Sequence, residues 1–222
     1  MFSFLKSKKS TIQSISIPNF DWNMETENTA LLVWINNEKT MGLSLNYFDL
    51  KPDLPTITDL DMIRDFYRTL VSQANGGLVE VDIIDLKGHA AVKTIFKFKQ
   101  EPHGMAYLAS LTIPFEKCSY VIKIQAPEFD MTGMRDSMIL ADFMREKKVK
   151  LGKNGLENWL QDPYDSDFKS TCLMNPSDLP VYDAEFPNHP LSQARKLLAT
   201  IESDIEFKAD IANNKKFIKY HF

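Results

Sequence analysis

The chain has 222 residues, of which 44% are hydrophobic and 25% are charged, and its formal net charge is −4. These proportions are typical of a globular protein that buries a sizeable core. Because there is no basic excess to neutralise phosphates, the composition argues against nucleic acid as a partner.

The N-terminal sequence MFSFLKSKKS does not have the order of a secretory signal, because its apolar residues precede its lysines. No stretch of the chain reaches the ~18 apolar residues of a membrane span. The two cysteines, Cys118 and Cys172, suggest neither a disulfide framework nor a CxxC metal pair. We therefore expect a cytoplasmic protein with reduced thiols and without membrane insertion.

Alternation of apolar and polar residues, which is typical of strands, dominates residues 12–126. The first part of this region predicts strands in IQSISIP, ALLVWI and MGLSLNYF. A helix is then expected over 60–74, where apolar residues recur at helical spacing. Thr58 or Asp59 is a suitable N-cap, and the Asn-Gly-Gly that follows ends the helix.

Four further segments predict an antiparallel meander, because they alternate and short turns join them, whereas parallel strands need long crossover connections. The segments are LVEVDIIDL, AVKTIFKFK, MAYLASLTIPF and CSYVIKIQA. A second helix is expected over 132–148, and a third over 190–207 with Pro190 in its first turn. The methionines around the second helix are interpreted as core filling; they are Met131, Met134, Met138 and Met144.

Residues 149–189 contain four prolines and five aromatic residues and show no sustained period. Disordered segments are poor in aromatic residues, so we expect an irregular arm that wraps the core and is fixed by its rings. The fold class is therefore α+β, a twisted antiparallel sheet of six or seven strands with helices on its faces. This α/β/α sandwich spans 12–148, an acidic arm and C-terminal helix span 149–222, and both belong to one domain, 1–222.

The stretch YVIKIQAPEFDMTGMRDSMI, residues 120–139, leads a strand into a helix through a carboxylate, a Thr-Gly pair and an arginine. A helix that starts near Thr132 exposes unpaired N–H groups and a partial positive charge. One interpretation is an anion-binding pocket formed by Thr132, Arg135 and the helix start, with Glu128 nearby. The interpretation that we favour is a structural corner, in which Glu128 and Arg135 form a salt bridge and Asp130 or Thr132 caps the helix.

Motifs for catalysis are missing from the sequence. Asp162, Asp165 and Asp167 do not have the spacing of an EF-hand loop, which also requires a glycine and a glutamate. There is no G-x-S-x-G elbow, no phosphate-binding loop and no local Cys–His signature. We therefore expect no metal, no cofactor and no enzymatic activity.

Negative charge is concentrated in residues 157–210, which hold eleven acidic and four basic residues, a net charge of −7. Complementary charge accelerates association, so this region suits a protein partner with a basic surface. The alternative is a solvated acidic face without a partner. The residues expected to contact a partner are Tyr164, Asp165, Asp167, Asp183, Glu185 and Phe186.

Three phrases stand out in the first part of the chain: GGLVEV at 76–81, YLASLTIPF at 107–115 and YVIKIQAPEFDMTGMR at 120–135. Together with the order of strands around one early helix, they resemble the PsbP/DcrB-like α/β/α sandwich over residues 12–148. This resemblance implies a non-catalytic protein, because members of that fold class act as assembly factors, lipoprotein accessories or adaptors. The chain departs from it by lacking a lipobox or signal peptide and by adding residues 149–222.

These observations predict a non-catalytic cytoplasmic protein-binding module of bacterial type. An immunity or antitoxin-like protein and a secretion-accessory protein are two concrete versions. The alternative is a small-anion-binding or enzyme-like domain that uses Arg135 and the helix start at 132. A third possibility is a structural subunit of a larger assembly, and the sequence leaves the oligomeric state open.

Overall fold

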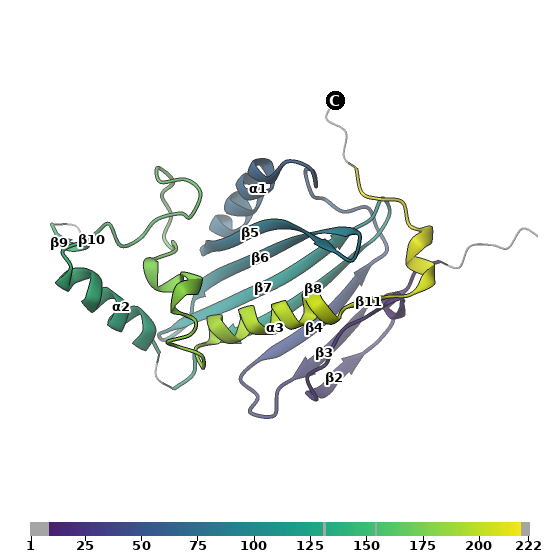
Figure 1. Ribbon diagram of the computed structural model, residues 1–222, viewed down its shortest axis with the longest axis horizontal. Helices are drawn as coiled ribbons and strands as arrows, with labels where there is room; N and C mark the ends of the chain where they lie inside the picture. The colour runs from purple at the N-terminus through teal and green to yellow at the C-terminus, as the bar shows by residue number, and fades with distance from the viewer. Residues whose placement is uncertain (1–8, 131, 154, 219–222) are drawn as a thin grey trace, which may run out of the picture.

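The centre of the computed structural model, which describes residues 9–130, 132–153 and 155–218, is a sheet of seven strands (Figure 1). Neighbouring strands are all antiparallel, in the order β2-β3-β4-β8-β7-β6-β5. The α+β class and the antiparallel sheet are thus confirmed. The strands are β2 (Asn23–Glu27), β3 (Leu31–Ile35), β4 (Gly42–Phe48), β5 (Gly76–Leu86), β6 (His89–Lys99), β7 (Met105–Pro114) and β8 (Ser119–Pro127).

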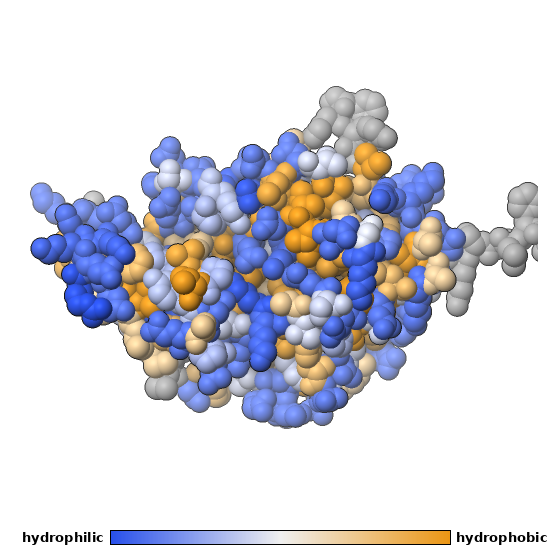
Figure 2. All heavy atoms as spheres, viewed as in Figure 1, coloured by the Kyte–Doolittle hydropathy of each residue, from blue (hydrophilic) through white to orange (hydrophobic). Residues whose placement is uncertain are grey.

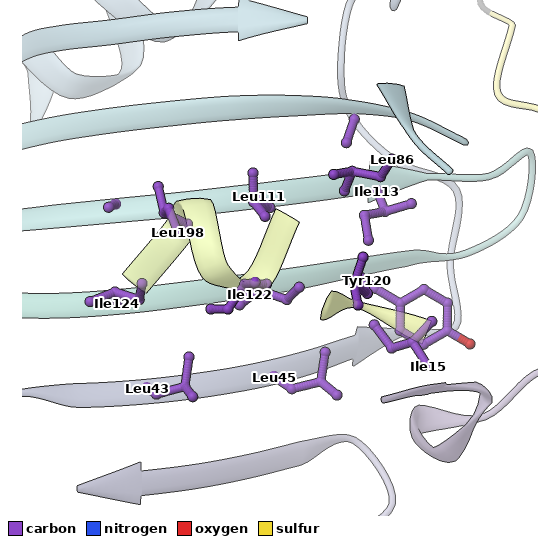
Figure 3. Close-up of a cluster of buried hydrophobic side chains, with 14 of the residues drawn as sticks. Ile15, Leu43, Leu45, Leu86, Leu111, Ile113, Tyr120, Ile122, Ile124 and Leu198 are labelled. Carbon is purple, nitrogen blue, oxygen red and sulfur yellow. The ribbon is translucent and has the colours of Figure 1, made fainter. Parts of the chain in front are cut away.

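One face of the sheet is covered by α3 (Pro190–Asp204), which crosses β7 and β8 (Figure 1). Alternate residues of these two strands point to that face, among them Leu111, Ile122 and Ile124, and Leu198 of α3 lies over them (Figure 3). Each of these side chains is fully buried or nearly so. Burial of one such side chain stabilises the fold by about 1.5–3 kcal/mol, so this layer contributes substantially to stability.

The other face is covered by α1 (Leu60–Gln73), which packs on β5. Ile63 and Val71 of α1 are buried against β5 and β6. Asp59 caps the helix as predicted, because its carboxylate accepts the Met62 N–H at 3.0 Å. Asn75 just after the helix has a positive φ of 57°, which ends the helix where the sequence indicated.

The second predicted helix, α2 (Met134–Arg145), lies at one end of the molecule, away from the sheet (Figure 1). It belongs to a small separate cluster, in which Ile139 packs with Val149, Trp159 and Phe186. The rings at 159 and 186 therefore fix the arm, as the sequence indicated.

The interpretation of the α2 methionines as core filling is wrong. Met134, Met138 and Met144 are between 43% and 49% exposed, while Met131 lies outside the described residues. Arg135 and Ile139 occupy the buried side of the helix instead. The helix therefore carries apolar residues on two sides, and only one of them is packed.

The remaining elements are short. β1 pairs with β11, so only two residues of the strand expected in IQSISIP are extended, and a 3-10 turn precedes them. Among the helices of the three described ranges, none is both long enough and apolar enough to cross a lipid bilayer. The short elements are η1 (Ile12–Ser14), β1 (Ile15–Ser16), β9 (Lys150–Gly152), β10 (Gly155–Glu157), η2 (Pro176–Asp178), η3 (Pro180–Tyr182), β11 (Glu206–Phe207) and η4 (Ala209–Asn213).

Candidate functional site

Arg135 is the centre of the contact between α2, α3 and the arm, which we define as residues 149–189. It lies in the first turn of α2, and its side chain is fully buried. The guanidinium donates to the backbone carbonyls of Ser177 at 2.6 Å and Leu179 at 3.0 Å. It also donates to Asp183 Oδ1 at 3.0 Å and to Ser192 Oγ at 2.7 Å. A planar group with five donors is suited to hold several acceptors at once, so Arg135 clamps the arm between the two helices.

Lys97 of β6 and Asp178 of the arm form a second anchor, in which both side chains are only 1% exposed and the charged atoms are 2.5 Å apart. Asp178 also accepts the Asn175 N–H at 3.0 Å and the Tyr107 hydroxyl at 3.3 Å. Burial and the nearby Asp178 raise the pKa of Tyr107 well above its usual value, so this hydroxyl stays a donor. The arm therefore neutralises a lysine that the sheet buries.

A chain of ion pairs continues from the arm along α3 to the sheet. Asp183 accepts from Arg195 at 3.1 Å, Arg195 lies 3.6 Å from Glu80, and Glu80 lies 3.3 Å from Lys93. Lys93 also pairs with Glu202 at 3.2 Å. Burial acts to lower the pKa of Lys93, but the two glutamates outweigh it and the pKa is raised. Each charged side chain of this network therefore has a partner of opposite charge within the molecule.

The outer part of the arm is held on α1 and β5. Asp162 is buried and pairs with Arg68 at 3.1 Å, and its carboxylate accepts the N–H groups of Tyr164 and Asp165. The Tyr164 hydroxyl accepts the Val81 N–H at 2.8 Å. Nowhere in the described ranges do three or more His, Cys, Asp or Glu side chains gather as a possible metal site.

These contacts change the interpretation of the acidic region. Asp162, Asp178 and Asp183 pair with basic residues of α1, β6, α2 and α3, so their charge holds the arm to the sandwich. Glu202 of α3 pairs with Lys93 and holds α3 on the sheet. Of the expected partner contacts, Asp183 and the buried Phe186 belong to this internal packing. Asp167 and Glu185 are exposed, and Tyr164 and Asp165 are half-buried.

The predicted salt bridge between Glu128 and Arg135 is wrong. Glu128 is buried and instead accepts from His189 Nε2 at 3.1 Å, and from the N–H groups of Met105 at 2.8 Å and Gly133 at 3.1 Å. Burial acts to raise the pKa of Glu128, but the hydrogen bonds from these three donors outweigh it, and the pKa is lowered. The N-cap of α2 is Gly133, not Asp130 or Thr132.

The anion site considered from the sequence is therefore occupied by the protein itself. Glu128 binds the N–H group at the start of α2, and Arg135 is saturated by acceptors of the arm and α3. A cavity of about 400 Å³ lies beside these residues and is lined by two carboxylates, those of Glu128 and Asp130, against the one guanidinium of Arg135, so it does not favour an anion. Thr132 is half-buried and lies next to this corner.

We expect Glu128→Gln to lower stability by about 1–2 kcal/mol at pH 7, because it replaces hydrogen bonds to a charged acceptor with neutral ones. The lowered pKa means that the carboxylate stabilises the fold above its unfolded pKa of about 4.3, and that this contribution is lost as the pH falls further. The difference between the two proteins should therefore shrink as the pH falls below about 4.3. Urea denaturation across this pH range measures it, and a constant difference would contradict the assignment.

Three side chains of types that support catalysis in other proteins are buried or engaged in the described structure. Cys118 and Cys172 are buried, and burial raises the pKa of both thiols, which keeps them protonated. His189 donates from Nε2 to Glu128, and its Nδ1 accepts the Leu191 N–H at 3.3 Å as the N-cap of α3. An imidazole whose nitrogens are both engaged is poorly placed to act as a general base.

Sequence reasoning missed the anchors Lys97, Arg195 and Glu80. Lys97 alternates with apolar residues of β6, and that pattern placed it on the polar face of its strand. The face is in fact the one that α3 and the arm cover, so the lysine is buried. One feature of the sequence did indicate these anchors. A lysine-rich strand and an aspartate-rich arm in the same chain have opposite charges and can form ion pairs with each other.

No protein-family model matches the sequence, and no curated protein matches it. Several solved structures are similar to it. The Saccharomyces cerevisiae Ran-binding protein Mog1p is 9% identical, with 87% of this chain and 86% of that chain covered and a TM-score of 0.41. The PsbP protein CyanoP from Synechocystis is 13% identical, with 66% and 94% covered and a TM-score of 0.35.

A protein from Bacteroides thetaiotaomicron is 11% identical, with 55% of this chain and 41% of that chain covered and a TM-score of 0.36. The chain thus spans less than half the length of that protein. The resemblance to PsbP that the sequence indicated recurs among these structures. At identities of 9–13% and TM-scores of 0.35–0.41, the matches carry no argument about function.

Proposed function

We propose that the protein is a non-catalytic protein-binding module and that it binds its partner through the outer side of the arm. The observation that carries this proposal is that an irregular segment, fixed by buried ion pairs, presents large apolar side chains to solvent. Val181 is 73% exposed, and Leu160 and Leu179 are also exposed. Figure 2 shows a small group of apolar, orange spheres over the arm, between α2 and the sheet. We call these three residues, together with Asp167 and Glu185, the arm face.

The anchoring of the arm favours binding, because a surface that is already ordered loses less conformational entropy when a partner docks. Lys97, Arg135 and Arg68 hold the arm at three places along its length. A groove of about 230 Å³ adjoins the arm face. Its lining includes Trp159, Met174 and Leu179. Its size suits one side chain of a partner.

The charge of the arm face favours a partner with a basic surface. Asp167 and Glu185 form no ion pair within the described ranges, so their charge is available to steer a basic protein. Binding without chemistry is what an immunity or antitoxin-like protein needs to block an effector, and what a secretion accessory needs to escort one. We propose that the protein acts in the cytoplasm, and either role can be performed there by a binding surface without catalytic groups.

The test compares variants of the arm face in affinity capture from extracts of the source organism. Val181→Asp, and Asp167→Lys combined with Glu185→Lys, should each lower recovery of a specific partner at least about tenfold, because a lost hot spot costs ~1.4 kcal/mol or more. Their melting temperatures should match the wild type, since these side chains are exposed.

The matched control is Glu25→Lys combined with Glu27→Lys on β2, which reverses two exposed acids at the opposite edge of the sheet. This control should retain the partner. A protein that all variants recover equally, or that only the β2 variant loses, refutes the arm face as the binding surface.

A further inference from the structure

The outer side of α2 is a second unpartnered surface, separate from the arm face. Met134, Met138, Ala141 and Met144 recur at helical spacing and are all exposed. They lie opposite Arg135 and Ile139, the side chains that the helix buries. Helices in water normally have one apolar side, so a second apolar stripe indicates a docking face. Methionine is frequent at such surfaces because its side chain adapts to the shape of a partner.

Charge is distributed unevenly along this stripe. Residues 145–153, at the C-terminal end of α2 and in the β9–β10 hairpin, hold five basic residues and one acidic residue. At the tip that carries these elements, Figure 2 shows strongly hydrophilic spheres. At the N-terminal end, the exposed charged side chain is the carboxylate of Asp130. The stripe therefore runs from an acidic end to a basic end, and the helix dipole has the opposite sense, positive at its N-terminus.

We propose that α2 binds α2 of a second copy of this chain, antiparallel and about a two-fold axis that passes near Met138 and Ala141. In this arrangement the basic end of each helix meets the acidic end of the other, and the helix dipoles oppose each other. A parallel arrangement would instead bring two strongly basic ends together. A surface that is complementary to itself is what a two-fold dimer requires, and such dimers are the commonest oligomers.

The size of the stripe sets the strength of this dimer. A helix of 12 residues is about 18 Å long, and stable interfaces bury about 800 Å² per partner. The exposed Phe129 lines the same cavity as Met134 and extends the apolar surface at the N-terminal end of α2. The interface stays at the small end of the range, so we expect a dissociation constant of the order of 10 µM.

Sedimentation velocity of the full chain over about a hundredfold concentration range tests the dimer. We expect a reversible shift from monomer to dimer. Met138→Glu should abolish the shift and leave the melting temperature unchanged, because Met138 is 49% exposed. Leu70→Glu on α1 is the matched control, since Leu70 is also 49% exposed, and it should dimerise as the wild type does. A monomer at every concentration, or dimerisation by Met138→Glu, overturns the proposal.

A charge exchange tests the antiparallel arrangement. Arg145→Glu and Asp130→Lys should each weaken their own dimer about tenfold, because each variant places like charges at both ends of the interface. A mixture of the two variants should recover the wild-type affinity, since every contact then joins opposite charges. Recovery that fails in the mixture, while Met138→Glu still disperses the dimer, refutes the two-fold arrangement.

Discussion

Replacing Arg135 by alanine is expected to destabilise the protein by about 3–5 kcal/mol, because a buried charged group that serves four acceptors is removed. The carbonyls of Ser177 and Leu179 would lose their donor, and each unsatisfied buried acceptor costs about 1–3 kcal/mol. Urea denaturation measures the loss. Arg135→Lys should be intermediate, since an ammonium keeps the charge but cannot reach all four acceptors.

The same substitution should loosen the arm specifically. Limited proteolysis should cut the Arg135→Ala variant within 149–189 under conditions that leave the wild type intact, because the clamp between α2 and α3 is lost. Lys215→Ala is the control: its pair with Glu116 is exposed, and such pairs contribute less than about 1 kcal/mol. A loss as small for Arg135→Ala as for this control would contradict its role as an anchor.

Asp178→Asn is the second large effect that we expect, again about 3–5 kcal/mol, because Lys97 would be left charged and buried without a partner. Adding Lys97→Met to this variant should restore part of the stability, since the unpaired charge is then removed. Chemical denaturation of the four proteins forms a double-mutant cycle, and its coupling energy measures the pair directly.

Two results would argue against this account of the pair. One is a double variant that is as unstable as the sum of the single variants, which would mean that the two side chains act independently. The other is a loss for Asp178→Asn below about 1 kcal/mol, the range of an exposed pair.

The sheet could be predicted from the sequence because alternation is a local property. The meander from β5 to β8 follows directly from runs such as YVIKIQA, where every second residue is apolar, and from the short turns between them. Asp59 and Asn75 bounded α1 for the same reason, since caps depend on only a few neighbouring residues. Local signals of this kind fixed the class of the fold.

The candidate site could not be predicted in the same way, because its partners are distant in sequence. Glu128 is seven residues before Arg135, yet Arg135 pairs with Asp183 and Glu128 pairs with His189. The arm decides these pairings, and no local pattern describes its path. Periodicity also failed on α2, since a helix with apolar residues on two sides gives no indication of which side is packed.

The pairing of β1 with β11 has a consequence for how the chain becomes compact during synthesis. Ile15 lies opposite Phe207, and Asn214 donates to Ser10, so contacts that span nearly the whole described sequence close the molecule. One apolar face of the sheet is covered by α3, which begins only at Pro190, late in the sequence. Until the ribosome has added these last segments, one hydrophobic face of the sheet is exposed to solvent. The nascent chain is most prone to aggregate at this stage, and a chaperone would be most useful then.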